Sequence, residues 1–129
     1  MSEEQKKPRL TLNRESRPYF EAAGKGRLVI KKCNACSRVH YYPRTICPHC
    51  YSEDTEFVEA SGRGVIYSYS VTRQAKPPYV IAYVTLEEGV TMLTNIVDCD
   101  VDSVRVGKKV KVKFIDAGEG MALPMFTSA

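Results

Sequence analysis

The stretch CNACSRVHYYPRTICPHC, residues 33–50, decides the fold. It holds two C-x-x-C pairs, Cys33 with Cys36 and Cys47 with Cys50, and ten residues separate the pairs. Each pair can form a tight turn, called a knuckle below, whose backbone amides point at the sulfurs. Two facing knuckles give the tetrahedral thiolate cage that zinc prefers. The spacing therefore predicts one structural metal site.

Three other interpretations of these residues stay open. A thioredoxin-like redox pair needs only one C-x-x-C, beside a β-α-β pattern that the sequence does not show. Iron would accept the same four ligands, but zinc is favoured because the site needs no redox role. His40 and His49 are conceivable ligands, although four cysteines already complete a tetrahedron. A closed site of this kind has no open position for metal catalysis.

Length and composition limit the size of the fold and the kind of partner. A chain of 129 residues makes one compact unit, or two very small units that share an interface. A segment of about 30 residues cannot fold on buried apolar surface alone, so metal binding would supply the missing stability. The formal net charge is +4. Four thiolates around a divalent ion would reduce it to roughly +2, which gives little support to a strongly nucleic-acid-binding surface.

The sequence predicts a cytoplasmic protein without membrane association. No apolar run approaches the roughly 18 residues that span a bilayer, and the N-terminal MSEEQKKPRL lacks the apolar stretch of a secretory signal. In a reducing compartment, paired cysteines favour metal ligation over disulfides. The fifth cysteine, Cys99, has acidic neighbours and is expected to be a half-buried residue at a strand end.

Patterns outside the cysteines divide the chain into four segments. Residues 1–12 are polar and predict a flexible arm. Residues 13–24 predict a short amphipathic helix, with a proline in the first turn and Gly24 as its end. Residues 25–55 form the zinc ribbon, in which GRLVIKKC and RVHYYP are the strands on either side of the first knuckle. Residues 56–129 are expected to form a barrel.

The last segment predicts five strands. EFVEASGRGVIYSYSVTR alternates and is broken by Gly62 and Gly64, which predicts one long, bent strand with a bulge. KPP at 76–78 marks a turn, and YVIAYVTLE and VTMLTNIVD flank a hairpin turn at EEG. VKVKFID and MALPMF complete the set, and the lysines of KKVKVKF indicate a solvated strand face. The fold class is therefore mainly β, ending in a five-stranded Greek-key OB-fold barrel.

The motifs are distinctive in combination. Several features follow one another in a single order across residues 13–126. They are a short helix with an aromatic pair, GRLVIKKCNAC, YYPRTICPHC, SGRGVIYSYSV, LEEG and LPMF. This arrangement resembles the family of small proteins that join a rubredoxin-like zinc ribbon to an OB-fold, long catalogued as a domain of unknown function. The resemblance implies an accessory subunit of an acyl-coenzyme A enzyme, such as a thiolase, hydroxymethylglutaryl-CoA synthase, aldolase or hydratase.

The resemblance assigns roles to few residues and transfers no catalytic residue, because the chemistry in such complexes belongs to the partner. Gly62 and Gly64 match the glycines that open the barrel. Ser37 and Tyr51 stand where the family usually has glycine after the second cysteine of each knuckle; the tyrosine calls the usual geometry or the metal affinity into question. The residues that match the metal ligands are Cys33, Cys36, Cys47 and Cys50.

Three classes of function follow. In the first, the chain is a non-catalytic subunit in a hetero-oligomer with a thiolase-like or related acyl-CoA enzyme. It would stabilise that enzyme and help to bind coenzyme A. The aromatic pair Tyr19 and Phe20 would pack on the chain itself or dock on the partner. Arg63, Arg73 and Lys76 lie near predicted strand ends and would contact coenzyme A phosphates, although ordinary surface cations are the simpler explanation.

The second class is a single-stranded nucleic-acid-binding module, in which Tyr67, Tyr69, Tyr79 and Tyr83 would supply stacking. Scattered basic residues argue against it, and tyrosines on a barrel more often lie in the core or at the rim. The third class, an independent enzyme, has the least support. The sequence shows no Ser/His/Asp set in a motif context, no glycine-rich phosphate loop and no open metal site.

Overall fold

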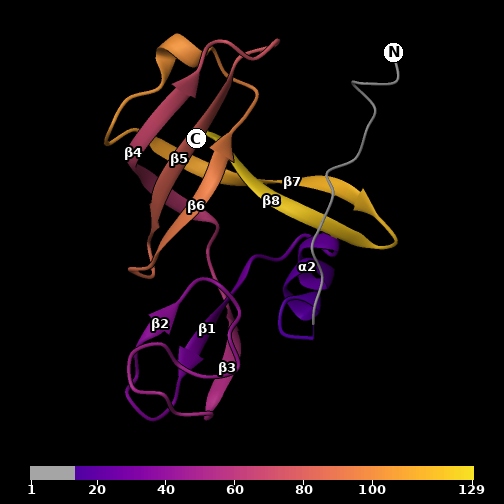
Figure 1. Ribbon diagram of the computed structural model, residues 1–129, viewed down its shortest axis with the longest axis vertical. Helices are drawn as coiled ribbons and strands as arrows, with labels where there is room; N and C mark the ends of the chain where they lie inside the picture. Colours follow the sequence, from indigo (N-terminus) through magenta and orange to yellow (C-terminus); the bar gives the residue numbers. More distant parts are fainter. Residues whose placement is uncertain (1–13) are drawn as a thin grey trace.

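A computed structural model describes residues 14–129 of the chain. Figure 1 shows a small sheet of three strands below a five-stranded barrel, with one short helix beside them. The arm expected over residues 1–12 lies outside the described residues. Within residues 14–129, no helix is long and apolar enough to cross a membrane.

The helix α2 covers Arg17–Gly24, so its N-terminal end lies four residues after the predicted one. Proline in its first turn is compatible with the helix, since the amide that proline lacks has no partner there anyway. The helix packs on the hairpin of the last two strands. Gly24 permits this packing, because a Cβ at this position would lie 1.8 Å from the carbonyl oxygen of Gly120.

The three-stranded sheet is the ribbon, with strand order β2-β1-β3. Its central strand β1, Val29–Cys33, pairs antiparallel with β2, Val39–His40, and with β3, Thr55–Glu59. β3 pairs with β1 along its whole length, so the sheet of the ribbon extends four residues beyond the predicted boundary at residue 55.

The prediction of one long, bent strand is wrong. The chain forms β3 in the ribbon and then β4, Arg63–Thr72, in the barrel. Gly62 lies between them with φ +80°, a left-handed conformation that favours glycine, and a Cβ there would lie 2.6 Å from Val112 Cγ1. Alternation of period two is the same in both strands, so it does not reveal where the chain leaves one sheet for another.

The barrel is closed, with strand order β4-β5-β6-β8-β7, and confirms the five-stranded OB-fold. Its neighbouring strands are antiparallel except β6 and β8, which meet in parallel at Ile96 and Phe126. The remaining strands are β5, Tyr79–Leu86; β6, Thr91–Ile96; β7, Lys109–Gly118; and β8, Met121–Ser128. A 3-10 helix, η1, covers Val101–Ser103 between β6 and β7.

Local predictions in the barrel hold in part. The EEG hairpin joins β5 to β6, and KPP lies in the turn between β4 and β5. The lysines of β7 are exposed, while Val110 between two of them is buried. The bulge occurs between Ile66 and Ser68 of β4, a few residues beyond the two glycines expected to mark it.

One apolar core joins the helix, the ribbon and the barrel. Tyr19 and Phe20 from α2 and Ile30 from β1 belong to the same buried cluster as Ile66 and Phe126 from the barrel. The barrel and the ribbon therefore do not have separate cores. Burial of large aromatic and aliphatic side chains stabilises all three parts together.

Candidate metal centre

The two knuckles have the same backbone pattern. In the first, the Ser37 amide donates to the Cys33 carbonyl at 2.9 Å. In the second, the Tyr51 amide donates to the Cys47 carbonyl at 2.8 Å. The second knuckle also directs the His49 amide at Cys47 Sγ, 3.3 Å away. Amides held in this orientation stabilise negative charge on a sulfur, which a metal-bound thiolate requires.

The folded chain brings the four predicted cysteines together, with all sulfurs within 4.8 Å of one another. Cys33 Sγ lies 3.6 Å from Cys50 Sγ, and Cys36 Sγ lies 3.8 Å from Cys47 Sγ. A tetrahedron with Zn–S bonds of about 2.3 Å has edges of about 3.8 Å. The sulfurs therefore have the separation that a four-thiolate metal site needs.

The thiols of the second knuckle have displaced pKa values. Burial raises the pKa of Cys47, but backbone amides of Cys50 and His49 and the thiols of the first knuckle outweigh it and lower the pKa to about 7. The pKa of Cys50 is lowered by the Ser52 amide, yet burial and hydrogen bonds to the other thiols raise it to about 12. Like charges at this separation resist joint ionisation, so a cation is needed to hold four thiolates.

Both residues that replace the usual knuckle glycine adopt the glycine conformation. Ser37 has φ +66° and Tyr51 has φ +67°. Replacement of the two glycines by serine and tyrosine therefore leaves the knuckle geometry intact. The left-handed conformation costs roughly 1–2 kcal/mol at each position. Tyr51 recovers little of that cost through burial, because 79% of the residue is exposed.

The two histidines do not join the sulfurs. Among the described residues, the one group of ligand atoms close enough to share a metal ion consists of the four cysteines. His40 lies on β2 and is buried; burial lowers its pKa, so the ring is neutral at pH 7. His49 contributes its amide to the second knuckle.

The segment before α2 is tied to the second knuckle. Glu15 accepts a hydrogen bond from the Thr45 amide, with 2.6 Å between Oε2 and the nitrogen. This bond lowers the pKa of Glu15. No local pattern predicts this contact, because the two residues lie 30 positions apart.

Tyr19 and Phe20 are not available to a partner. Tyr19 is 3% exposed and Phe20 is 8% exposed, and their rings meet edge to face with 5.0 Å between centroids. Tyr19 also makes an edge contact with Tyr41 of the ribbon. The docking alternative for this pair is therefore wrong; both rings pack on the chain itself and fix α2 to the ribbon.

The three predicted phosphate contacts do not form one site. Arg63 begins β4, whereas Arg73 and Lys76 follow its other end. A strand of ten residues separates these ends by on the order of 30 Å. Arg63 lines a cavity of about 430 Å³ together with Lys109, a residue that sequence analysis left on the solvated face of β7.

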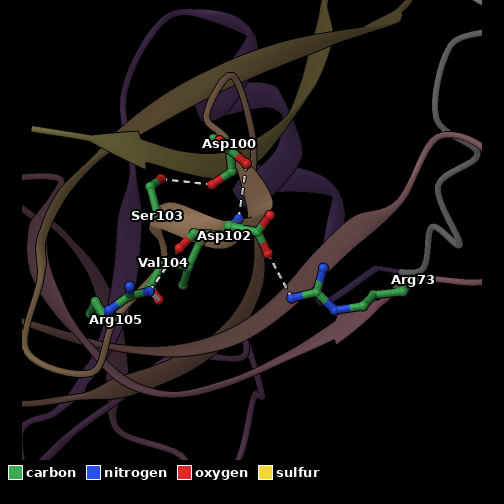
Figure 2. Close-up of polar contacts among 6 residues, drawn as sticks. All are labelled: Arg73, Asp100, Asp102, Ser103, Val104 and Arg105. Carbon is green, nitrogen blue, oxygen red and sulfur yellow. Dashed lines mark hydrogen bonds and ion pairs between the residues drawn. The ribbon is translucent and has the colours of Figure 1, made fainter.

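Arg73 already has a protein partner. Figure 2 shows its guanidinium directed at the carboxylate of Asp102, with Nη2 2.8 Å from Oδ1. Asp102 is held in place by η1, where the Asp100 side chain accepts from the Asp102 amide at 3.0 Å. The neighbouring Arg105 donates to the Asp102 carbonyl at 2.8 Å. Arg73 thus connects the β4–β5 turn to the segment between β6 and β7.

A four-thiolate ribbon that shares a core with a closed five-stranded barrel defines a class of zinc-ribbon and OB-fold proteins. Residues 20–56 match the family described as "ChsH2, rubredoxin-like zinc ribbon domain", and residues 57–114 match "ChsH2, C-terminal OB-fold domain". The chain belongs to this family, whose members are also named DUF35 proteins.

Two relatives and one solved structure show the extent of the likeness. The "Probable enoyl-CoA hydratase alpha subunit" of Thermomonospora curvata is 39% identical over 128 residues, which cover 95% of this chain and 40% of that protein. This chain thus spans less than half of the hydratase subunit. A "DUF35 domain-containing scaffold protein" of Methanothermobacter thermautotrophicus is 43% identical over 90 residues, 64% of this chain and 68% of that protein.

The solved structure described as "Ltp2-ChsH2(DUF35) aldolase" contains a chain with the same architecture. The two chains are 38% identical and superpose with a TM-score of 0.80, over 93% of this chain and 98% of the other. The resemblance stated from sequence motifs is confirmed. By name, the three similar proteins are an enoyl-CoA hydratase subunit, a scaffold protein and part of an aldolase.

Proposed function

We propose that this chain is a non-catalytic accessory subunit of an acyl-CoA enzyme, which it binds and stabilises in a hetero-oligomer. The observation that carries the proposal is the match to the aldolase structure over 98% of the matched chain. The partner class is an aldolase, hydratase or thiolase-like enzyme, and it supplies the residues that transform the acyl group.

The metal of the site is one structural zinc ion, held by Cys33, Cys36, Cys47 and Cys50. Four thiolates at tetrahedral spacing suit both zinc and iron. Zinc is favoured because a scaffold needs no redox step. Zinc supplies the energy that joins the two knuckles, and the chain's amides orient the sulfurs.

Two features support a non-catalytic role. Four cysteines complete the coordination of a tetrahedral ion, which leaves no position for a substrate. The match covers 40% of the hydratase alpha subunit, so the other 60% of that subunit is available for catalytic residues. The matched part of that subunit covers 95% of this chain.

A coenzyme A thioester is a further proposed ligand of the complex. The cavity beside Arg63 and Lys109 offers these two cations, one acidic side chain, Glu87, and an apolar wall formed by Val65, Leu86 and Val110. Arginine binds phosphate through a bidentate fork, so the nucleotide end of coenzyme A is the part expected here. Arg73 and Lys76 lie too far from this cavity to contact the same phosphates.

The proposed location is the cytoplasm. All five cysteines of the chain are free of disulfides. Thiols persist in that form in a reducing compartment, where the ribbon cysteines remain available to a metal ion.

Affinity purification of the tagged chain from its native host, followed by mass spectrometry, tests the proposal. The expected result is an acyl-CoA enzyme subunit in a fixed stoichiometric ratio, with acyl-CoA turnover that depends on that subunit. Turnover of acyl-CoA by the purified chain alone, or recovery of the chain without any acyl-CoA enzyme, would contradict the proposal.

A further inference from the structure

The barrel carries an exposed apolar surface on β4, β5 and β6. Its members are 37–68% exposed, although all are aromatic or aliphatic. We call this surface the tyrosine face. It consists of Tyr67, Tyr79, Ile81, Tyr83 and Leu93.

Strand register places these side chains on one side of the sheet. Tyr79, Ile81 and Tyr83 are alternate residues of β5, and the residues between them are buried in the barrel. Leu93 of β6 lies directly opposite Tyr83, so the two side chains point to the same face. Tyr67 lies in the bulge of β4, next to Ser68, which also pairs with Tyr83. The alternation thus gives β5 one face for the core and another for a partner.

The tyrosine face has no charged residue at its centre. The outward positions of β5 and β6 carry, besides the residues already named, only Thr85, Thr91 and Asn95. The exposed lysines of the barrel strands lie on β7, which neighbours β4 and not β5. Two more exposed cations, Arg73 and Lys76, lie in the β4–β5 turn at the Tyr79 end of the face, and Arg73 is paired with Asp102. The cores of protein interfaces are enriched in tyrosine and depleted in charge. Nucleic-acid surfaces interleave cations with aromatic residues to neutralise phosphates.

The exposed area is of the size that a protein partner covers. A large aromatic or aliphatic side chain at these exposures offers on the order of 100 Å², so five of them give roughly 500 Å². One side of a standard protein interface covers about 800 Å², with an apolar centre and a polar rim. The threonines and Asn95 beside the tyrosine face supply part of such a rim.

We propose that the tyrosine face is the docking surface for the acyl-CoA enzyme subunit. This inference rests on the proposed function and specifies its interface. The helix α2 is excluded as the anchor because its aromatic residues are in the core. We place Tyr83 and its cross-strand partner Leu93 at the centre of the contact, because Ile81 and the bulge residue Tyr67 also lie beside Tyr83.

Substitutions on the two central residues test this interface. Tyr83→Glu and Leu93→Glu each place a charge on the outward face, where the fold tolerates it. Val106→Glu is the matched control, because Val106 is 66% exposed but lies in the segment before β7, outside the tyrosine face. The probe is the acyl-CoA enzyme subunit that co-purifies with the wild-type chain, produced separately. Circular dichroism and zinc content verify that all variants fold.

The expected result is a dissociation constant raised at least 30-fold by Tyr83→Glu and by Leu93→Glu, as for central interface residues, and changed less than about threefold by Val106→Glu. If both face variants bind like wild type, the enzyme docks elsewhere and this inference is wrong, while the proposed function stands. If the wild-type chain binds no acyl-CoA enzyme subunit, both fail. Binding of a 20-nucleotide oligo-dT that Tyr83→Glu abolishes would assign the face to nucleic acid instead.

Discussion

Cys33 Sγ lies 3.6 Å from Cys50 Sγ, although the two residues are 17 positions apart. This contact joins the first cysteine of one knuckle to the last cysteine of the other. The connection between them contributes the short strand β2 and residues that pack on α2, such as Tyr41. Closure of the metal site therefore fixes the ribbon, which shares one core with the barrel and the helix.

Cys47→Ser should remove the metal and unfold the ribbon. Three thiolates cannot complete the cage, and the binding energy of the ion is part of the folding energy of the ribbon. Elemental analysis should find about one zinc ion per wild-type chain and close to none per variant after dialysis against a weak chelator. The matched control is Cys99→Ser, which changes the half-buried cysteine outside the site and should keep its zinc. Full zinc content in Cys47→Ser would refute the ligand assignment.

Tyr51→Gly should stabilise the metal-bound chain by roughly 0.5–1 kcal/mol. Glycine removes the left-handed strain at φ +67°, and its greater flexibility in the unfolded chain offsets part of that gain. Tyr51→Ala keeps the strain and serves as the control. Thermal unfolding of zinc-loaded protein measures both variants. A lower melting temperature for Tyr51→Gly would show that the exposed ring makes contacts that stabilise the chain.

Gly24→Ala should destabilise the chain by about 2 kcal/mol or more, although alanine is the better helix former. The new methyl group would lie 1.8 Å from a backbone oxygen of the β7–β8 turn, which cannot move away as a side chain can. Glu21→Ala changes an exposed residue of the same helix and removes only its surface ion pair with Arg17, so it should cost below about 0.5 kcal/mol. Urea unfolding compares the two. Equal stability of both variants would mean that α2 does not pack closely on the hairpin.

His40 should make the stability of the chain fall in mild acid. Burial lowers the pKa of His40 below its ordinary value of 6.5, so the unfolded chain binds its proton more readily than the folded chain. The free energy of unfolding therefore decreases as the pH falls through about 6.5 towards the lower pKa of the folded state. His40→Gln removes this component and leaves the contribution of the thiolates unchanged. Unfolding curves measured between about pH 7.5 and 5.5 should fall more steeply for wild type; parallel curves for both proteins would contradict the buried, neutral ring.

Sequence patterns with a local cause predicted the structure well. The cysteine spacing predicted the cluster of four sulfurs because each knuckle is formed within a few residues. The alternation in KKVKVKF identified the solvated face of β7, and EEG identified the β5–β6 turn. These features depend on neighbours in the sequence, so they can be inferred without knowledge of the tertiary fold.

Features with a long-range cause were missed. The run from Glu56 to Arg73 alternates on both sides of Gly62, so its pattern does not reveal that Gly62 divides it between two sheets. The burial of Tyr19 depends on Tyr41 and on the β7–β8 hairpin, which no pattern in residues 13–24 specifies. Arg73 carried no sign of its ion pair with Asp102, because that pairing requires the β4–β5 turn to meet η1 in space.

The most direct test of the scaffold account is native mass spectrometry of the complex purified from the host, combined with an acyl-CoA turnover assay of its separated parts. The account predicts one zinc ion per copy of this chain, an acyl-CoA enzyme subunit bound to it, and turnover that remains with the enzyme subunit. Turnover that remains with this chain, or a complex that contains no acyl-CoA enzyme, would contradict it.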